Sequence, residues 1–277
     1  MKDFNNNFIY DLTPEDKEMI QEYKKFYADF FNFGNKLLDD CFHEPIQDYE
    51  LTIYSAYYRF LELLDTLEIM TENSLINSGL LIIRSLLELT AQLCYVLCDD
   101  NEIQKRASIW QMIDIKRTAR DDETFYKAMA AKDCYKNYAD ILRNNKWPNW
   151  YSYCENKRMS IENIFMTAGI KDLYDNLYRP LCLENHETNH METNIIIDEY
   201  NKRFHFKPFR TFENDVLLMH SIIKIVLPLN SMMINRYGND ALKLEWTQYQ
   251  EKLERLIKDD DSLAEIAKIF NPLNKWY

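Results

Sequence analysis

Arg84, Glu88 and Gln92 are polar residues in the most apolar stretch of the sequence. Their four-residue spacing places all three on one face of a helix. Because taking an ion out of water costs on the order of several kcal/mol, charged residues in such a helix need a partner or a function. The pattern predicts one of two arrangements. Either Glu88 orients Arg84 toward an anionic substrate, or the two form an intrahelical salt bridge that also bonds to neighbouring helices.

Arg179 and His186 form a second candidate pair, seven positions apart. Seven residues are about two helical turns, so both side chains would lie on one helix face. A histidine can move protons at a ribose 2′-hydroxyl or a leaving oxygen, and an arginine can stabilise charge that develops on phosphate. The pair therefore suits metal-free RNA cleavage. Pro180 disfavours the α conformation in the residue before it, which predicts that Arg179 lies at the helix cap.

The same segment contains an HExxH motif, formed by His186, Glu187 and His190. Two histidines four residues apart can bind zinc, and the glutamate can act as general base toward a zinc-bound water. Glu199 and Glu213 are candidate third ligands. The polar flanks and the scarcity of glycine disfavour a zinc peptidase. The alternative is that His186 is structural and His190 is solvated.

Two tracts combine basic and aromatic residues, Tyr200–Arg210 and Lys146–Arg158. Such tracts suit stacking on bases and binding of phosphates, so both are candidate contacts for RNA or a nucleotide. The alternative is a pair of loops whose aromatic rings pack inward and whose charges face water.

The composition favours a helical protein. Only four of the 277 residues are glycine, far below the usual share of about 7%. The sequence lacks the glycine-rich phosphate loop and the dinucleotide-binding fingerprint. A net charge of −12 disfavours general binding to nucleic acid. Six scattered cysteines without a CxxC pair fit a reducing compartment, and together with a polar N-terminus they predict a cytoplasmic location.

Helical spacing and capping signals predict the elements that must position these residues. Residues 1–12 are expected to be a flexible arm and residues 13–277 a single helical domain, with a long loop or subdomain seam near 144–156. Helices are expected over residues 13–41, 48–72, 74–98, 101–120, 123–143, 161–167, 171–190, 212–235, 241–258 and from 262, with an irregular segment or short hairpin at 200–210.

Two of these segments are hydrophobic enough to test as membrane spans. Gly79–Cys98 contains Arg84, Glu88 and Gln92, and Val216–Asn230 is short and includes Pro228. A span needs about 20 residues with few or no charges. We therefore expect both to be buried core helices, with 74–98 the central helix and no membrane association.

The chain resembles a large family of bacterial proteins of unknown function. The resemblance covers roughly residues 50–230 and depends on two short motifs, an R-S-L-x-E helix at Arg84–Glu88 and a Y-x-x-L-C/S-x-x-x-H segment at Tyr178–His186. It implies an all-helical domain in which Arg84, Glu88 and His186 come together. Glu187 departs from the small or amide residue usual after that histidine, which implies that the HExxH motif is a coincidence.

That family is in turn similar to the helical HEPN group of ribonucleases and nucleotide-binding proteins, many of which act in phage defence and toxin–antitoxin pairs. The similarity implies an all-α multi-helix bundle with a HEPN-like core and additional helices. It also implies a homodimer, because such sites are often built across two subunits. Pro180 departs from the HEPN motif, which has a polar residue after its arginine.

The first hypothesis is therefore a HEPN-like, metal-independent ribonuclease in phage defence or a stress response. His186 would be the acid/base, Arg179 or Arg84 would stabilise phosphate, and Glu88 would orient its arginine, without a cofactor. The second hypothesis is a non-catalytic module that binds a nucleotide or another anion, or a scaffold. The third is an HExxH zinc peptidase, with His186 and His190 as ligands and Glu187 as base.

Overall fold

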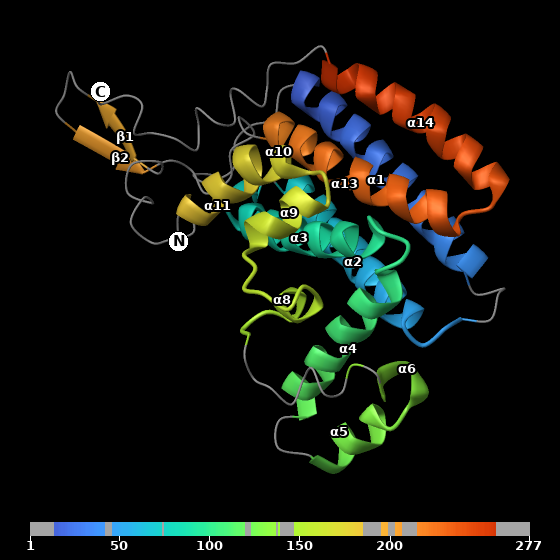
Figure 1. The fold of residues 1–277 in the computed structure, drawn as a ribbon. Coiled ribbons are helices and arrows are strands. Elements are labelled where there is room, and N and C mark those ends of the chain that lie inside the picture. Colours follow the sequence, from blue (N-terminus) through green and yellow to red (C-terminus); the bar gives the residue numbers. More distant parts are fainter. Residues whose placement is uncertain are drawn as a thin grey trace.

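The computed structural model describes residues 14–41, 46–73, 75–119, 123–136, 138, 147–184, 195–198, 203–206 and 215–258. The N-terminal arm expected over residues 1–12 and the helix expected from residue 262 lie outside these ranges. Within them the structure is a bundle of helices with one small two-stranded hairpin, which confirms the predicted all-α multi-helix class (Figure 1).

The four helices of the first half of the chain follow the predicted bounds closely: α1 (Pro14–Cys41), α2 (Glu50–Glu72), α3 (Ile76–Leu97) and α4 (Ile103–Ala119). They are followed by short elements: α5 (Glu123–Ala130), α6 (Asp133–Lys136), α8 (Trp150–Cys154), α9 (Ile161–Thr167), α10 (Lys171–Leu173), the π-helical turn η1 (Tyr174–Tyr178) and α11 (Arg179–Glu184). Strands β1 (Ile195–Asp198) and β2 (Arg203–Phe206), then α13 (Asp215–Tyr237) and α14 (Asp240–Lys258), complete the described chain.

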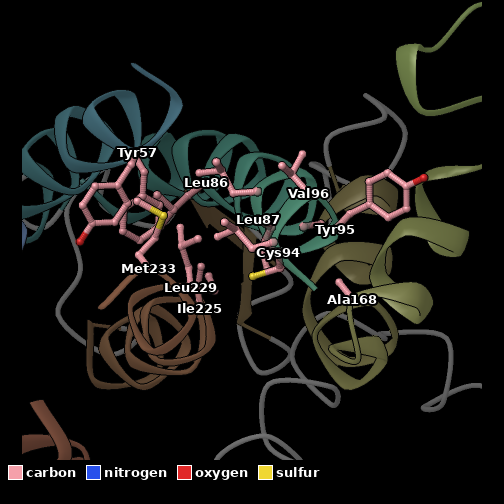
Figure 2. Close-up of a cluster of buried hydrophobic side chains, with 14 of the residues drawn as sticks. Tyr57, Leu86, Leu87, Cys94, Tyr95, Val96, Ala168, Ile225, Leu229 and Met233 are labelled. Atoms are coloured by element: carbon pink, nitrogen blue, oxygen red, sulfur yellow. The ribbon is translucent and has the colours of Figure 1, made fainter. Parts of the chain in front are cut away.

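Helix α3 lies at the centre of the bundle, as its apolar sequence predicts. It packs against α2, α13 and α9, and also contacts α4 and α11. Leu86 and Leu87 of α3 share one buried cluster with Ile225 and Leu229 of α13 (Figure 2). Among the described residues, Gly79–Leu97 is long and apolar enough to cross a membrane. However, 56% of that stretch is buried inside the protein, and core helices pass the same test.

Helices α1, α13 and α14 form the layer that covers α2 and α3 on one side (Figure 1). Phe33 of α1 packs edge-on against Trp246 of α14, with ring centroids 5.1 Å apart. The buried hydroxyl of Tyr57 on α2 donates to Oδ1 of Asn230 on α13 at 3.0 Å. Pro228 lies inside α13, which continues on both sides of it.

One expectation about the middle of the chain was wrong. The single helix expected over residues 123–143 is interrupted after Ala130, where α5 ends and a turn leads into α6. The turn brings Tyr135 of α6 back onto α4, where it is buried and hydrogen-bonds to Gln111, so tertiary contact overrides helix propensity. Within the segment expected to be a long loop or subdomain seam, near 144–156, the structure has the short helix α8, where the indole rings of Trp150 and Trp110 stack 4.9 Å apart.

The segment expected to be irregular or a short hairpin, residues 200–210, contains one strand of a hairpin, β2. Strands β1 and β2 pair antiparallel, with Ile195 opposite Phe206 and Asp198 opposite Arg203. The first strand, β1, lies wholly before the predicted segment. The hairpin lies apart from the helical layers in Figure 1, while α9, α10 and α11 lie against the end of the bundle that includes α3.

Candidate functional site

The Arg84–Glu88 pair forms as predicted, but it is not deeply buried. Nε of Arg84 lies 3.2 Å from Oε1 of Glu88, and the two side chains are 35% and 36% exposed. Helix α3 turns Leu86 and Leu87 into the core and presents Arg84 and Glu88 at the edge of the packed face. The desolvation cost expected from the sequence is therefore smaller, and such a pair stabilises a helix by only about 0.2–0.5 kcal/mol.

Tyr178 completes this pair from a distant part of the chain. Its hydroxyl donates to Oε1 of Glu88 at 2.7 Å, so one carboxylate oxygen accepts from both Tyr178 and Arg84. The guanidinium of Arg84 also lies over the Tyr178 ring, 5.9 Å from its centroid. Burial and the hydrogen bond to Glu88 raise the pKa of Tyr178, so the phenol keeps its proton and acts as a donor at neutral pH.

The π-helical turn η1 positions Tyr178. Tyr178 is its last residue and stacks on Tyr174 with ring centroids 5.6 Å apart, while Phe165 of α9 contacts both rings. π-Helical turns are rare and occur frequently at functional sites. The wider turn here holds the ring that fixes Glu88.

Arg179 lies at an element boundary, as the cap predicted for it implies, but Pro180 does not move it out of the α conformation. Arg179 has φ −62° and ψ −47°, which is α-helical, and it begins α11. A proline in a helix removes one hydrogen bond and crowds the carbonyl four residues earlier. That residue, Asn176, lies in the π-helical turn, where the hydrogen-bonding pattern already differs from that of an α-helix.

Gln92 extends the same network toward α8. Its amide Nε2 donates to the backbone oxygen of Glu88 at 3.2 Å, and its Oε1 accepts from the indole Nε1 of Trp150 at 2.7 Å. The polar face predicted from the spacing of Arg84, Glu88 and Gln92 is therefore one connected set of hydrogen bonds. Burial, together with the negative charge of Glu88, raises the pKa of the nearby Tyr151 hydroxyl.

Arg84 is a permanent cation in this site. Burial lowers its pKa, but Cys182, Tyr178 and Glu88 together raise it by more, so the net shift is upward. Cys182 is a half-buried free thiol on α11. The arrangement is a charged guanidinium that a carboxylate and a phenol ring fix at a partly exposed position. A group of this kind can bind an anion.

Of the other predicted site residues, the structure describes Arg179 but not those of the HExxH motif. Arg179 is exposed at the start of α11 and influences the pKa of Tyr174. His186, Glu187 and His190 lie outside the described residues, as do both candidate third zinc ligands. Within the described ranges no group of three or more His, Cys, Asp or Glu side chains is placed to hold a metal ion.

The two basic and aromatic tracts are described only in part. In Lys146–Arg158 the rings of Trp150, Tyr151 and Tyr153 are buried, while Lys157 and Arg158 are exposed. These three rings therefore pack into the protein interior, which was the second of the two interpretations of this tract, and are not free to stack on bases. In Tyr200–Arg210 the described residues are those of β2.

Sequence reasoning missed Tyr178 and Trp150 as members of the site. Tyr178 was named only as the first residue of a motif, and Trp150 only as part of a basic and aromatic tract. The signal that could have singled out Tyr178 was its fixed spacing from Cys182 and His186 in that motif. Nothing in the sequence pairs Trp150 with Gln92, because the two are 58 residues apart.

Comparison with known proteins identifies the family. Residues 50–203 match the model of a family of unknown function, DUF5677. The match spans more than half of the chain, from α2 to β2, so the protein belongs to this family. It includes Arg84, Glu88, Gln92, Trp150 and Tyr178. No curated protein and no solved structure matches the chain.

Proposed function

We propose that this protein binds a phosphate-bearing ligand, RNA or a nucleotide, at the Arg84 site. The observation that supports this most is the fixed, partly exposed guanidinium of Arg84, held through Nε by Glu88 and lying over the ring of Tyr178. An arginine held through Nε can present its two terminal nitrogens as a fork, and this fork matches the geometry of phosphate oxygens.

The surrounding charges favour one local anion rather than a long nucleic-acid track. Glu88 would repel a phosphate if it were unpaired, but Arg84 and the Tyr178 hydroxyl both bond to its Oε1. The chain as a whole carries a net charge of −12, which weakens binding to a phosphate backbone at long range. Affinity would therefore depend strongly on the local positive charge of Arg84.

The experiment is a thermal-shift panel of nucleoside mono-, di- and triphosphates, a short single-stranded RNA and inorganic phosphate. A ligand that binds the folded state raises the melting temperature. We expect a shift for the wild type that is lost in Arg84→Gln. Arg59→Gln is the matched control, because Arg59 forms an exposed helical ion pair with Glu62 at 2.9 Å elsewhere on the surface.

Equal shifts in the wild type and Arg84→Gln would overturn the proposal, and so would the absence of a shift with every ligand. A loss of the shift in Arg59→Gln as well would show that net charge, not this site, governs binding.

The second candidate function is HEPN-like, metal-independent RNA cleavage in the cytoplasm, in phage defence or a stress response. The observation that favours it is the position of α11. This helix contacts α3, follows Tyr178 directly and ends at Glu184, two positions before His186 in the sequence. The proposed acid/base therefore follows, in the sequence, an element packed at the arginine site.

The test is incubation of labelled single-stranded RNA with the protein in the presence of EDTA. We expect cleavage by the wild type, none by His186→Ala, and retained RNA binding by that variant. In cells, induction of the wild type should fragment total RNA and arrest growth, whereas His186→Ala should do neither. Cleavage that EDTA abolishes, or that His186→Ala retains, would exclude this mechanism.

A further inference from the structure

Large exposed apolar side chains gather on one face of α2. Leu51, Tyr58 and Ile69 are 45%, 58% and 55% exposed, while the other large exposed apolar residues of the described chain lie singly on α3, α9 and α14. At about 100° per residue the three side chains on α2 point within about 20° of one direction. Exposed polar residues fill the face between them. We call the whole set the α2 stripe: Leu51, Ser55, Tyr58, Glu62, Asp65 and Ile69.

The α2 stripe is symmetric in its chemistry about position 60. Leu51 and Ile69 are both nine residues from that position, and both are apolar. Ser55 and Asp65 are each five residues away, and Tyr58 and Glu62 are each two residues away. In both of these pairs a hydroxyl donor on one side of the centre is matched by a carboxylate acceptor on the other.

We infer that the α2 stripe is a contact surface for a second copy of this chain, which binds antiparallel across a two-fold axis near position 60. In this arrangement Leu51 meets the partner's Ile69, the Ser55 hydroxyl donates to the partner's Asp65, and the Tyr58 hydroxyl donates to the partner's Glu62. An isologous interface makes every such contact twice.

The dimensions of the α2 stripe fit a reversible dimer. It extends over 19 residues, and the rise from the first to the last is about 27 Å. A contact between two helices of this length lies at the low end of the areas that specific protein interfaces bury. The acidic residues at its centre disfavour a lipid surface, because anionic lipids attract basic segments rather than carboxylates. The self-complementary order of donors and acceptors favours a second copy over an unrelated helix.

Sedimentation velocity on the full chain over a range of protein concentrations tests this inference. We expect a monomer–dimer equilibrium in the wild type. Ile69→Lys or Leu51→Glu alone should weaken association about tenfold or more, because each places a charge against an apolar side chain. In the double variant the introduced lysine faces the introduced glutamate of the partner, so association should recover. Leu244→Lys is the matched control, because Leu244 is 62% exposed on α14, away from the α2 stripe.

Far-UV circular dichroism confirms that each variant is folded. The substituted side chains are exposed, and a glutamate near the start of a helix and a lysine near its end both favour the helix. A wild type that is monomeric at every concentration would overturn the inference. Single variants that associate like the wild type would also overturn it. A double variant that stays as weak as the single variants would overturn the antiparallel register.

Discussion

Replacing Tyr178 by phenylalanine removes a single hydroxyl from the centre of the candidate site. The ring, with its stacking on Tyr174 and its contact with Arg84, stays in place. What is lost is the hydrogen bond from the hydroxyl to Oε1 of Glu88 at 2.7 Å. Two side chains donate to this oxygen in the wild type, and in the variant Arg84, at 3.2 Å, is the one of the two that remains.

The expected loss of stability is about 1 kcal/mol. A hydrogen bond to a charged group contributes about 1.5–3 kcal/mol. The side chain of Glu88 is 36% exposed, so water can replace part of the lost bond and the cost is smaller. For a chain of 277 residues, about 2.1 cal/mol/K of unfolding entropy per residue converts 1 kcal/mol to a melting-temperature decrease of about 2 °C.

Urea denaturation of the wild type, Tyr178→Phe, Glu88→Gln and the double variant measures this effect. We expect a coupling free energy on the order of 1 kcal/mol between the two positions. Tyr174→Phe is the control. It also removes one phenolic hydroxyl, from the same aromatic stack, and keeps the contacts of the Tyr174 ring with Phe165 and Tyr178. A Tyr178→Phe variant as stable as the wild type, or additive effects in the double variant, would show that the hydrogen bond between Tyr178 and Glu88 does not stabilise the fold.

Three further predictions concern thiol reactivity, alkaline pH and metal content. Burial raises the pKa of Cys154 to about 12 and also raises that of Cys94, so both thiols should resist iodoacetamide in the native state while the exposed Cys98 reacts, as peptide mass spectrometry would show. Burial also raises the pKa of Tyr95 and of Tyr178. Above about pH 10 the unfolded chain therefore releases phenolic protons that the folded chain keeps, and the free energy of unfolding should fall as pH rises, in urea titrations. Elemental analysis of the purified protein should find no stoichiometric zinc; one zinc per chain would favour the HExxH motif instead.

The long helices were predictable because their apolar residues recur at helical spacing. The polar face of α3 was predictable for the same reason, since residues four apart on a helix are neighbours whatever surrounds them. Arg84, Glu88 and Gln92 accordingly form the local part of the network that the structure shows.

The long-range contacts were not predictable from a single sequence. Tyr178 is 90 residues from Glu88, and no periodic pattern relates two segments that meet only through tertiary packing. The helical conformation of Arg179 depends on the π-helical turn before it, which has no reliable sequence signal. Helix α8 forms in a tract rich in turn residues because its side chains, including Trp150, are buried against α4 and α3.

The most direct test of the Arg84 site is fluorescence anisotropy of a short labelled single-stranded RNA titrated with the wild type, Arg84→Gln, Arg84→Lys and Arg59→Gln. We expect saturable binding by the wild type and by Arg59→Gln. Binding should be at least about tenfold weaker in Arg84→Gln and intermediate in Arg84→Lys, which keeps the charge but loses the planar fork. An Arg84→Gln variant that binds as tightly as the wild type would show that Arg84 does not bind the RNA.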